Sequence, residues 1–284
     1  MAFDPSDDGQ AADARCVWSE LSAPTRMPGL VNTANDEWFP APAANDTQLF
    51  FHTGMMPSLG RDLWFATRPD RFSTFGVPQR VVEIATTADE VTPSLTSDGL
   101  VLVYSIETGG PADLWLAQRS DPNAMWDPPA PITNNAVYAD HTPAVSADGL
   151  RIVSAANYPG SIGGRDLFEH VRGDRAAAFG TPIVLEPLTS LADDSAPALS
   201  PDGLELVFAS GRSGGPGGYD PYYTRRASLD QPFEPPVLLA QLATPFDDYG
   251  FRFSDDGAAL YFNYDTATIG GRNADVWIAT RTCQ

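Results

Sequence analysis

Short apolar runs alternate with turn-forming residues along almost the whole chain, and this pattern repeats five times. In the fourth repeat the run Pro197–Ser200 leads into a turn at Asp202-Gly203, and a second apolar run, Leu204–Ser210, follows at once. Because Asp-Gly between two apolar runs favours a tight turn with positive φ, each pair predicts a β-hairpin. The other hairpins are predicted at Leu49–Phe51 after Asn45-Asp46-Thr47, Pro93–Ser105, Pro143–Ala155 and Phe251–Asn263.

Two further runs complete each repeat after a Gly-rich loop. The third run carries an Asp that is followed two residues later by an aromatic residue and six residues later by Arg, as in Asp62, Trp64 and Arg68. The other copies of this Asp and Arg are Asp113 and Arg119, Asp166 and Arg172, Asp220 and Arg226, and Asp275 and Arg281. The fourth run contains an aromatic residue and Pro (Phe75–Pro78, Trp126–Pro131, Phe179–Pro182, Phe233–Pro236), so we expect it at the outer edge of a sheet.

Four antiparallel strands recurring about every fifty residues are typical of propeller blades. We therefore expect an all-β fold, a single five-bladed antiparallel β-propeller at residues 16–284, after a flexible segment at residues 1–15. The fifth repeat lacks its fourth strand, and Trp18–Pro24 matches Phe72–Pro78 in spacing. An N-terminal strand would complete the last blade and remove an open edge. The expected blades are approximately 33–84, 85–133, 134–187, 188–240, and 241–283 with 16–30.

The two cysteines map to one place in the repeat, the position of Asp70 between the third and fourth strands. We predict a disulfide between Cys16 and Cys283 that locks the ring, and the alternative is two unpaired thiols. Disulfides persist in oxidising compartments. We therefore expect a periplasmic or extracellular protein, with a signal peptide absent from this sequence because residues 1–15 lack the charged-then-apolar pattern.

Composition excludes several partners. The formal net charge is −20 and all 17 basic residues are Arg. Nucleic acid and anionic membrane surfaces are therefore unfavourable partners, and the absence of Lys excludes Schiff-base chemistry. No apolar run approaches the roughly 18–20 residues of a membrane span. We expect a monomer whose acidity supports solubility, with cation binding as the alternative.

The order Ser-x-Asp-Gly, Gly-rich loop and Asp-Leu-Trp resembles the WD40-like repeats of the TolB family of bacterial propellers. The best copy runs from Ser200 to Arg212, and the resemblance spans about residues 33–282. The resemblance implies a bacterial propeller; family members include periplasmic interaction scaffolds and accessory domains of enzymes. The resemblance does not extend to the extra N-terminal domain of the Tol-system protein, and five blades are fewer than the family's usual six or seven.

An acid stands three residues before the start of each first strand, and five carboxylates are expected to ring the channel mouth: Glu37, Glu90, Asp140, Asp194 and Asp248. Three interpretations remain open. The carboxylates cap backbone N–H groups, or they form a site for a hard cation such as Ca²⁺, or two of them catalyse glycoside hydrolysis. No other cofactor is expected.

The residue after each acid differs between repeats, and variation beside a repeated neighbour is where ligand preference could be encoded. We expect Trp38, His141 and Tyr249 to bind a ligand, together with the arginines of the Gly-rich loops, Arg61, Arg165, Arg212 and Arg272. The alternatives are side chains that plug the channel mouth and arginines that pair with nearby acids.

The repeated Asp and Arg of the third strand are expected to be structural, with the Arg pairing an Asp of the Asp98 type. Catalytic motifs are sparse, since His52, His141 and His170 fall at different strand positions. The first functional hypothesis is a non-catalytic scaffold that binds a protein or glycan at the channel mouth of a bacterial envelope or secreted protein. A carbohydrate-active enzyme of the glycoside hydrolase type is the second. A purely architectural ring that serves an absent partner domain is the third.

Overall fold

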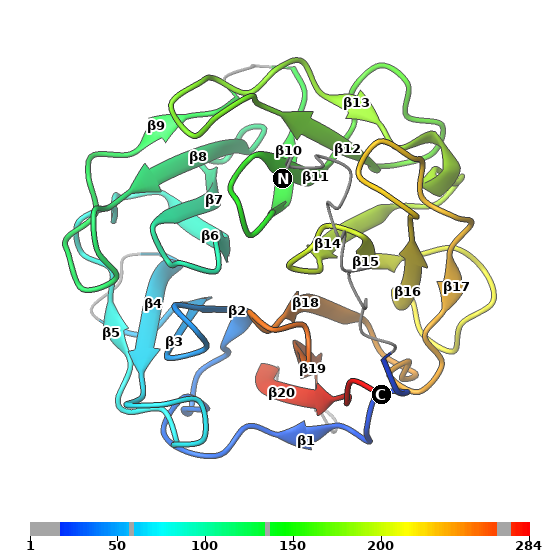
Figure 1. The fold of residues 1–284 in the computed structure, drawn as a ribbon. Helices are drawn as coiled ribbons and strands as arrows, with labels where there is room; N and C mark the ends of the chain where they lie inside the picture. The colour runs from blue at the N-terminus through cyan, green and yellow to red at the C-terminus, as the bar shows by residue number, and fades with distance from the viewer. Residues whose placement is uncertain (1–17, 57–59, 134–136, 266–273) are drawn as a thin grey trace, which may run out of the picture.

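The computed structural model describes residues 18–56, 60–133, 137–265 and 274–284. They form five four-stranded antiparallel sheets arranged around a central axis, as Figure 1 shows. The prediction of an all-β, five-bladed propeller is confirmed. The innermost strand of each blade is the first in sequence (β2, β6, β10, β14 and β18 in Figure 1), so five strands from distant parts of the chain surround the channel.

The blades have the following strands. Blade 1 contains β2 (Trp38–Ala43), β3 (Gln48–Thr53), β4 (Asp62–Thr67) and β5 (Gln79–Arg80). Blade 2 contains β6 (Asp89–Leu95), β7 (Val101–Glu107), β8 (Asp113–Gln118) and β9 (Ala130–Pro131). Blade 3 contains β10 (Asp140–Val145), β11 (Arg151–Ala156), β12 (Asp166–Val171) and β13 (Ile183–Val184). Blade 4 contains β14 (Asp194–Leu199), β15 (Glu205–Ser210), β16 (Asp220–Arg225) and β17 (Val237–Leu238). Blade 5 contains β18 (Asp248–Phe253), β19 (Ala259–Asp265), β20 (Ala274–Thr280) and β1 (Thr25–Arg26).

The outermost strands are only two residues long and mostly begin after the predicted aromatic-Pro runs. In blade 1 the run Phe75–Pro78 precedes β5, which pairs with β4 through Trp64↔Arg80 and Phe65↔Gln79. Pro lacks the N–H that a ladder needs. The aromatic ring packs inward instead, since Phe75 is 2% exposed. The predicted boundaries of the fourth strands are therefore corrected by a few residues toward the C-terminus.

The ring closes as predicted, because the N-terminal strand β1 pairs antiparallel with β20 through Thr25↔Ile278 and Arg26↔Trp277. An isolated antiparallel bridge joins Trp18 to Cys283. This bridge brings Cys283 beside a residue that is two positions after Cys16. Residues 1–15 and Cys16 lie outside the described residues, so the Cys16–Cys283 bond remains a prediction.

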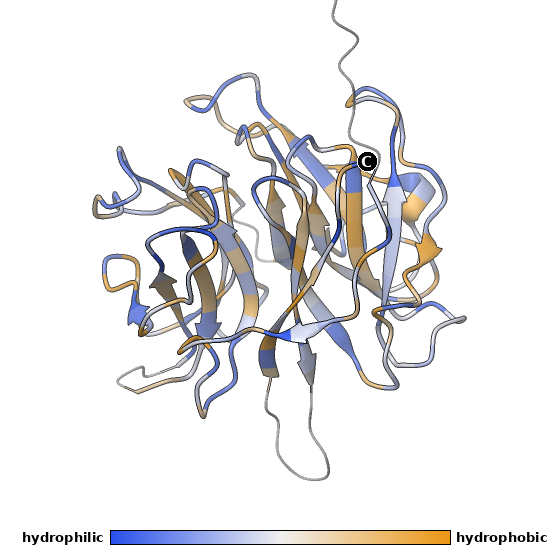
Figure 2. Cartoon of the chain, turned by 60° about the horizontal axis from the view of Figure 1, so that its bottom comes forward, coloured by the Kyte–Doolittle hydropathy of each residue, from blue (hydrophilic) through white to orange (hydrophobic). Residues whose placement is uncertain are grey.

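The hydrophobic core lies between neighbouring blades. One cluster joins Phe50 and Leu63 of blade 1 to Leu102 and Tyr104 of blade 2, and another joins Val207 of blade 4 to blade 5. Figure 2 shows hydrophobic positions interspersed with polar ones along the strands, as expected when alternate residues face a neighbouring sheet. Each sheet is thus buried on both sides, which fixes the geometry of the channel that the inner strands surround.

The repeated Arg of the third strand is structural, but its expected pairing is wrong. The Nε of Arg119 donates to the carbonyl of Gly99 at 2.7 Å, and its guanidinium lies 4.2 Å from the ring centroid of Trp126. The Asp98 carboxylate instead accepts from the Thr96 hydroxyl at 2.6 Å and pairs with Arg175. The Arg bonds to the Gly carbonyl and not to the Asp carboxylate, because the Asp side chain already stabilises its own turn.

Candidate functional site

Every inner strand contains a β-bulge two residues after the acid that repeats from blade to blade. The residues there have positive φ between 48° and 72°, and they are Phe39, Thr92, Thr142, Ala196 and Gly250. In blade 3 the pairing of β10 with β11 shifts register between His141 and Ala144. A bulge redirects neighbouring side chains, and positive φ at a non-Gly residue costs on the order of 1 kcal/mol. Four blades keep this strained conformation without glycine.

The bulges present the variable residues to one cavity of about 650 Å³. All five residues that follow the acids line it, namely Trp38, Val91, His141, Ser195 and Tyr249. The predicted ligand-binding residues Trp38, His141 and Tyr249 are thus brought together. The side chains that the sequence did not single out here are Asp36, Phe39, His52 and Glu107. A cavity of this size is in the usual range for small-molecule sites.

The five repeated acids do not line this cavity among its described residues. Glu37, Glu90, Asp140, Asp194 and Asp248 are all 0% exposed. Glu37 accepts hydrogen bonds from the backbone N–H and the hydroxyl of Thr33. Asp248 accepts hydrogen bonds from the backbone N–H and the hydroxyl of Thr244, each at 2.8 Å. Each of these two carboxylates therefore fixes the loop that enters its blade. This arrangement agrees with the capping interpretation.

Burial makes four of these acids harder to ionise, and it raises the pKa of Glu90 as well as those of Glu37, Asp140 and Asp248. It raises the pKa of Glu37 to about 7 and those of Asp140 and Asp248 to about 6. Within the described parts of the chain, no three His, Cys, Asp or Glu side chains are grouped so as to hold a metal ion. The Ca²⁺ site at Glu37, Glu90, Asp140, Asp194 and Asp248 remains an untested prediction.

These raised pKa values predict a stability that falls as pH rises. The folded protein retains protons on Glu37, Asp140 and Asp248 above the pH at which the unfolded chain loses them. The contribution of these groups to stability is therefore lost between about pH 4 and pH 7. For Glu37 the loss is on the order of 1–3 kcal/mol. We expect the midpoint of thermal unfolding to be higher at pH 5 than at pH 8, and Glu37→Gln to flatten the profile. A midpoint that rises from pH 5 to pH 8 would contradict this.

Two of the four predicted loop arginines line the cavity. The Nε and Nη2 atoms of Arg61 donate to Asp89 at 3.1 and 2.9 Å, and Nη2 also donates to Glu107 at 2.5 Å. Arg165 makes the equivalent pair with Asp193 at 3.1 and 2.6 Å. Both guanidinium groups are therefore held rigidly at the cavity wall.

Of the other two predicted arginines, Arg212 does not line the cavity. Arg212 donates to Asp194 at 2.8 Å and lies over the rings of Phe208 and Tyr222, so it supports blade 4. Arg272 lies outside the described residues. The alternative in which loop arginines pair with nearby acids is thus seen for Arg212, and also for Arg61 and Arg165.

Four of the five repeated acids are preceded by an Asp whose role was not predicted from the sequence. Asp36, Asp89, Asp193 and Asp247 each accept a backbone N–H across the blade boundary, from Ala274, Arg61, Arg165 and Tyr219 at 2.5 to 3.1 Å. A second acid in front of the first was the available signal. The N–H that Asp36 accepts belongs to Ala274, whereas those that Asp89 and Asp193 accept belong to arginines. Asp36 also lines the cavity.

The two histidines of the cavity have fixed roles. The Nδ1 atom of His52 accepts the N–H of Thr92 at 3.1 Å, so the neutral ring carries its proton on Nε2. Burial lowers the pKa of His52 to about 3, which keeps the ring neutral. The Nδ1 atom of His141 lies 3.9 Å from Glu107, but burial and Arg165 together lower its pKa. Both rings therefore offer neutral hydrogen-bonding groups at physiological pH.

Tyr249 is positioned by an aromatic neighbour. Its ring centroid lies 5.0 Å from that of Tyr219, whose hydroxyl donates to Asp193 at 2.8 Å. Burial raises the pKa of Tyr249 above its usual range, so the phenol remains protonated. The Asp193 carboxylate thus links Arg165 and the Tyr219–Tyr249 pair on one side of the cavity.

No family model and no curated protein matches the chain. Among solved structures it is similar to TolB from Acinetobacter baumannii (TM-score 0.55, 12% identity), covering 87% of this chain and 55% of that one. The chain thus spans little more than half of that protein. A thermostable family-43 glycoside hydrolase has a TM-score of 0.61 at 12% identity, covering 91% and 92%. An α-L-arabinofuranosidase from Lactobacillus brevis has 0.58 at 13%, covering 90% and 94%. These identities show the propeller fold alone.

Proposed function

We propose that this propeller is a non-catalytic binding module that holds a glycan-type ligand in the cavity lined by Trp38, His141 and Tyr249. One observation carries the proposal. Five positions with the same backbone geometry have five different side chains, and all five line a single cavity. A scaffold that repeats its backbone and varies its side chains at the cavity wall is suited to recognising a particular ligand.

The lining suits a polar molecule with an apolar face. Trp38 and Tyr249 come from neighbouring blades 1 and 5 and offer aromatic surface, while Ser195, His141 and Glu107 offer hydrogen-bonding groups. Aromatic surface beside a few placed polar groups is the usual chemistry of a specific pocket. A sugar ring presents both kinds of surface, since its C–H face packs on an aromatic ring and its hydroxyls reach polar groups.

The ionisation of the carboxylates supports binding over catalysis. Glycoside hydrolysis by two carboxyl groups requires one that stays protonated near neutral pH. The acids with such raised pKa values, including Glu37 and Asp248, are buried away from the cavity. Glu107, which does line the cavity, is paired with Arg61 at 2.5 Å.

A glycoside hydrolase is the second candidate. Two carboxylates, Asp36 and Glu107, line the cavity. The structural similarity to the family-43 glycoside hydrolase covers 91% of this chain and 92% of that one. Turnover of aryl arabinofuranosides or xylosides that Glu107→Gln abolishes would establish this candidate. Binding without turnover of the bound glycan supports the binding module.

We also propose a bacterial envelope or secreted location and a monomeric state. The predicted Cys16–Cys283 bond supports the oxidising compartment. In the described parts of the chain no helix is long and apolar enough to cross a membrane. Fractionation of the native host would test the location.

A thermal-shift screen against a glycan panel tests the binding function, followed by titration calorimetry with the best ligand. Trp38→Ala and Tyr249→Ala should each weaken binding about tenfold, because an aromatic contact contributes on the order of 1 kcal/mol. The matched control is Phe72→Ala, since Phe72 is 91% exposed and lies beside Arg71, which pairs with Asp256 in a turn at the opposite end of the blades. No shift with any glycan, or equal affinity in Trp38→Ala, would contradict the proposal.

A further inference from the structure

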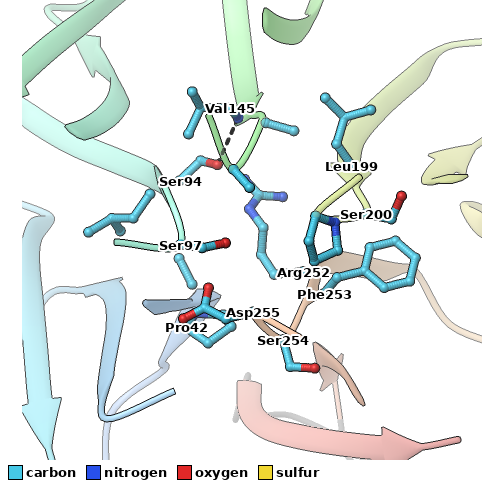
Figure 3. Close-up of a pocket in the computed structure, with 15 residues that line it drawn as sticks. Pro42, Ser94, Ser97, Val145, Leu199, Ser200, Arg252, Phe253, Ser254 and Asp255 are labelled. Carbon is cyan, nitrogen blue, oxygen red and sulfur yellow. Dashed lines mark hydrogen bonds between the residues drawn. The ribbon is translucent and has the colours of Figure 1, made fainter. Parts of the chain in front are cut away.

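The side chain of Arg252 in β18 crosses the central channel. The positions aligned with it in the other blades hold small residues, namely Ala41, Ser94, Ala144 and Ala198. Figure 3 shows Arg252 extending from its strand toward Ser94 and Val145 on the far side of the channel. These four small residues leave room for the long side chain of Arg252, which is 5% exposed.

Backbone carbonyls from several blades hold the guanidinium. Nη1 donates to the carbonyls of Pro197 and Phe251 at 2.8 and 2.7 Å. Nη2 donates to those of Pro143 and Pro93 at 2.8 and 3.4 Å. Among the described residues no carboxylate pairs with Arg252. Its charge is offset by the backbone carbonyl dipoles and by the ring of Phe39, whose centroid lies 6.0 Å from the guanidinium carbon. A buried cation without a counter-charge is unfavourable, and burial lowers the pKa of Arg252 to about 9, which still leaves it charged at neutral pH.

One donor of this guanidinium is left over. The Nε–H of Arg252 is buried and has no hydrogen-bond partner among the described atoms. Arg252 also lines a small enclosure of about 30 Å³ next to Ser94, Ser97 and Asp255 (Figure 3). One water-sized particle needs roughly 10–15 Å³ by this measure, so there is room for one or two.

A second donor faces the same enclosure. The Ser94 hydroxyl oxygen accepts the N–H of Val145 at 3.0 Å, so its own proton remains available to donate. The enclosure therefore offers an N–H that belongs to a cation and an O–H, both of which need an acceptor. A metal cation is excluded by the charge of Arg252. Water can accept both bonds, but it supplies no negative charge.

We propose that this enclosure binds a small monovalent anion of the halide class, held by the Nε–H of Arg252 and the hydroxyl of Ser94. The anion would accept from both donors and would lie against a guanidinium that pairs with no carboxylate among the described residues. The site lies in the channel and is distinct from the cavity of Trp38, His141 and Tyr249. It therefore stands or falls independently of the proposed glycan binding.

The test is the midpoint of thermal unfolding in sodium bromide and in sodium gluconate at equal ionic strength. It is made at pH 6, because burial and Asp46 raise the pKa of Asp255 to about 7 and this carboxyl is then mostly uncharged. Saturable halide binding should raise the midpoint by about 2 °C more in bromide than in gluconate. Equal midpoints in the two salts would overturn the proposal in favour of water.

Two variants and one control locate the effect. Arg252→Met and Ser94→Ala should each remove the bromide-specific rise, and Ser94→Ala keeps the test valid if Arg252→Met does not fold. Arg151→Met is the control, because Arg151 has a carboxylate partner, Glu169, at 3.1 Å and should keep the rise. A bromide-specific rise that persists in Ser94→Ala, or bromide-soaked crystals without an anomalous peak in the enclosure, would overturn the assignment.

Discussion

Reduction of the predicted disulfide between Cys16 and Cys283 should lower the midpoint of thermal unfolding by about 10 °C. Such a bond would close a loop of nearly the whole chain, and loop-closure entropy predicts a contribution of roughly 4–5 kcal/mol. For a chain of this size, 1 kcal/mol corresponds to about 2–4 °C. The structure brings the two ends together independently of the bond, through β1 with β20 and Trp18 with Cys283. Calorimetry with and without reductant measures the effect.

Cys283→Ser should reproduce the effect of reductant and should make the protein insensitive to it. Because the bond acts mainly on the unfolded chain, we expect the blade contacts of the folded state to survive its loss. Mass spectrometry of alkylated protein under non-reducing conditions provides the control. Two alkylated cysteines in the folded, untreated protein would show that the prediction is wrong.

Arg252→Ala should lower stability by about 3 kcal/mol. The substitution leaves the carbonyls of Pro93, Pro143 and Pro197 without their donors, and an unsatisfied buried group costs about 1–3 kcal/mol. It also removes a side chain that bonds to three other blades. Part of this loss is offset, because a buried charge that is itself costly disappears.

The matched comparison for Arg252 is Arg225→Ala. Arg225 forms an exposed pair with Glu234, with side-chain exposures of 66% and 58%. Exposed pairs contribute about 0–1 kcal/mol, so its loss should be small. Chemical denaturation of both variants measures the difference. Equal stability of Arg252→Ala and Arg225→Ala would mean that the channel side chain does not hold the blades together.

The repeat alone predicted most of the fold. Asp-Gly turns, the third-strand Asp and Arg, and the spacing of Trp18–Pro24 gave the blades and their closure by β1. The fourth strands were predicted a few residues too close to the N-terminus, because an aromatic-Pro run has the composition of an extended segment. The hydrogen bonds of the sheet, however, require backbone N–H groups, and these are supplied by the residues that follow Pro. A repeated local pattern therefore predicts strand pairing well where the residues that pair are themselves part of the repeat.

The candidate site was predicted only in part. Variation after each acid pointed correctly to the cavity residues Trp38, His141 and Tyr249. The acids themselves are buried, and Glu37, Glu90 and Asp248 accept backbone N–H groups of the preceding loops. The bulge instead turns the following side chain into the cavity. Side chains that enter from the second strand, such as His52 and Glu107, belong to no repeated pattern and needed the pairing register. The role of Arg252 was not predicted from the sequence, because its side chain can cross the channel only where the other blades have small residues.

The most direct test of the central claim is titration calorimetry of a bound glycan with the double variant Trp38→Ala/Tyr249→Ala. If the cavity is the binding site, affinity should fall about a hundredfold, twice the free-energy loss of either single variant for contacts that act independently. Phe72→Ala should bind as the unaltered protein does. Undiminished affinity in the double variant, with the same unfolding midpoint as the unaltered protein, would contradict the claim.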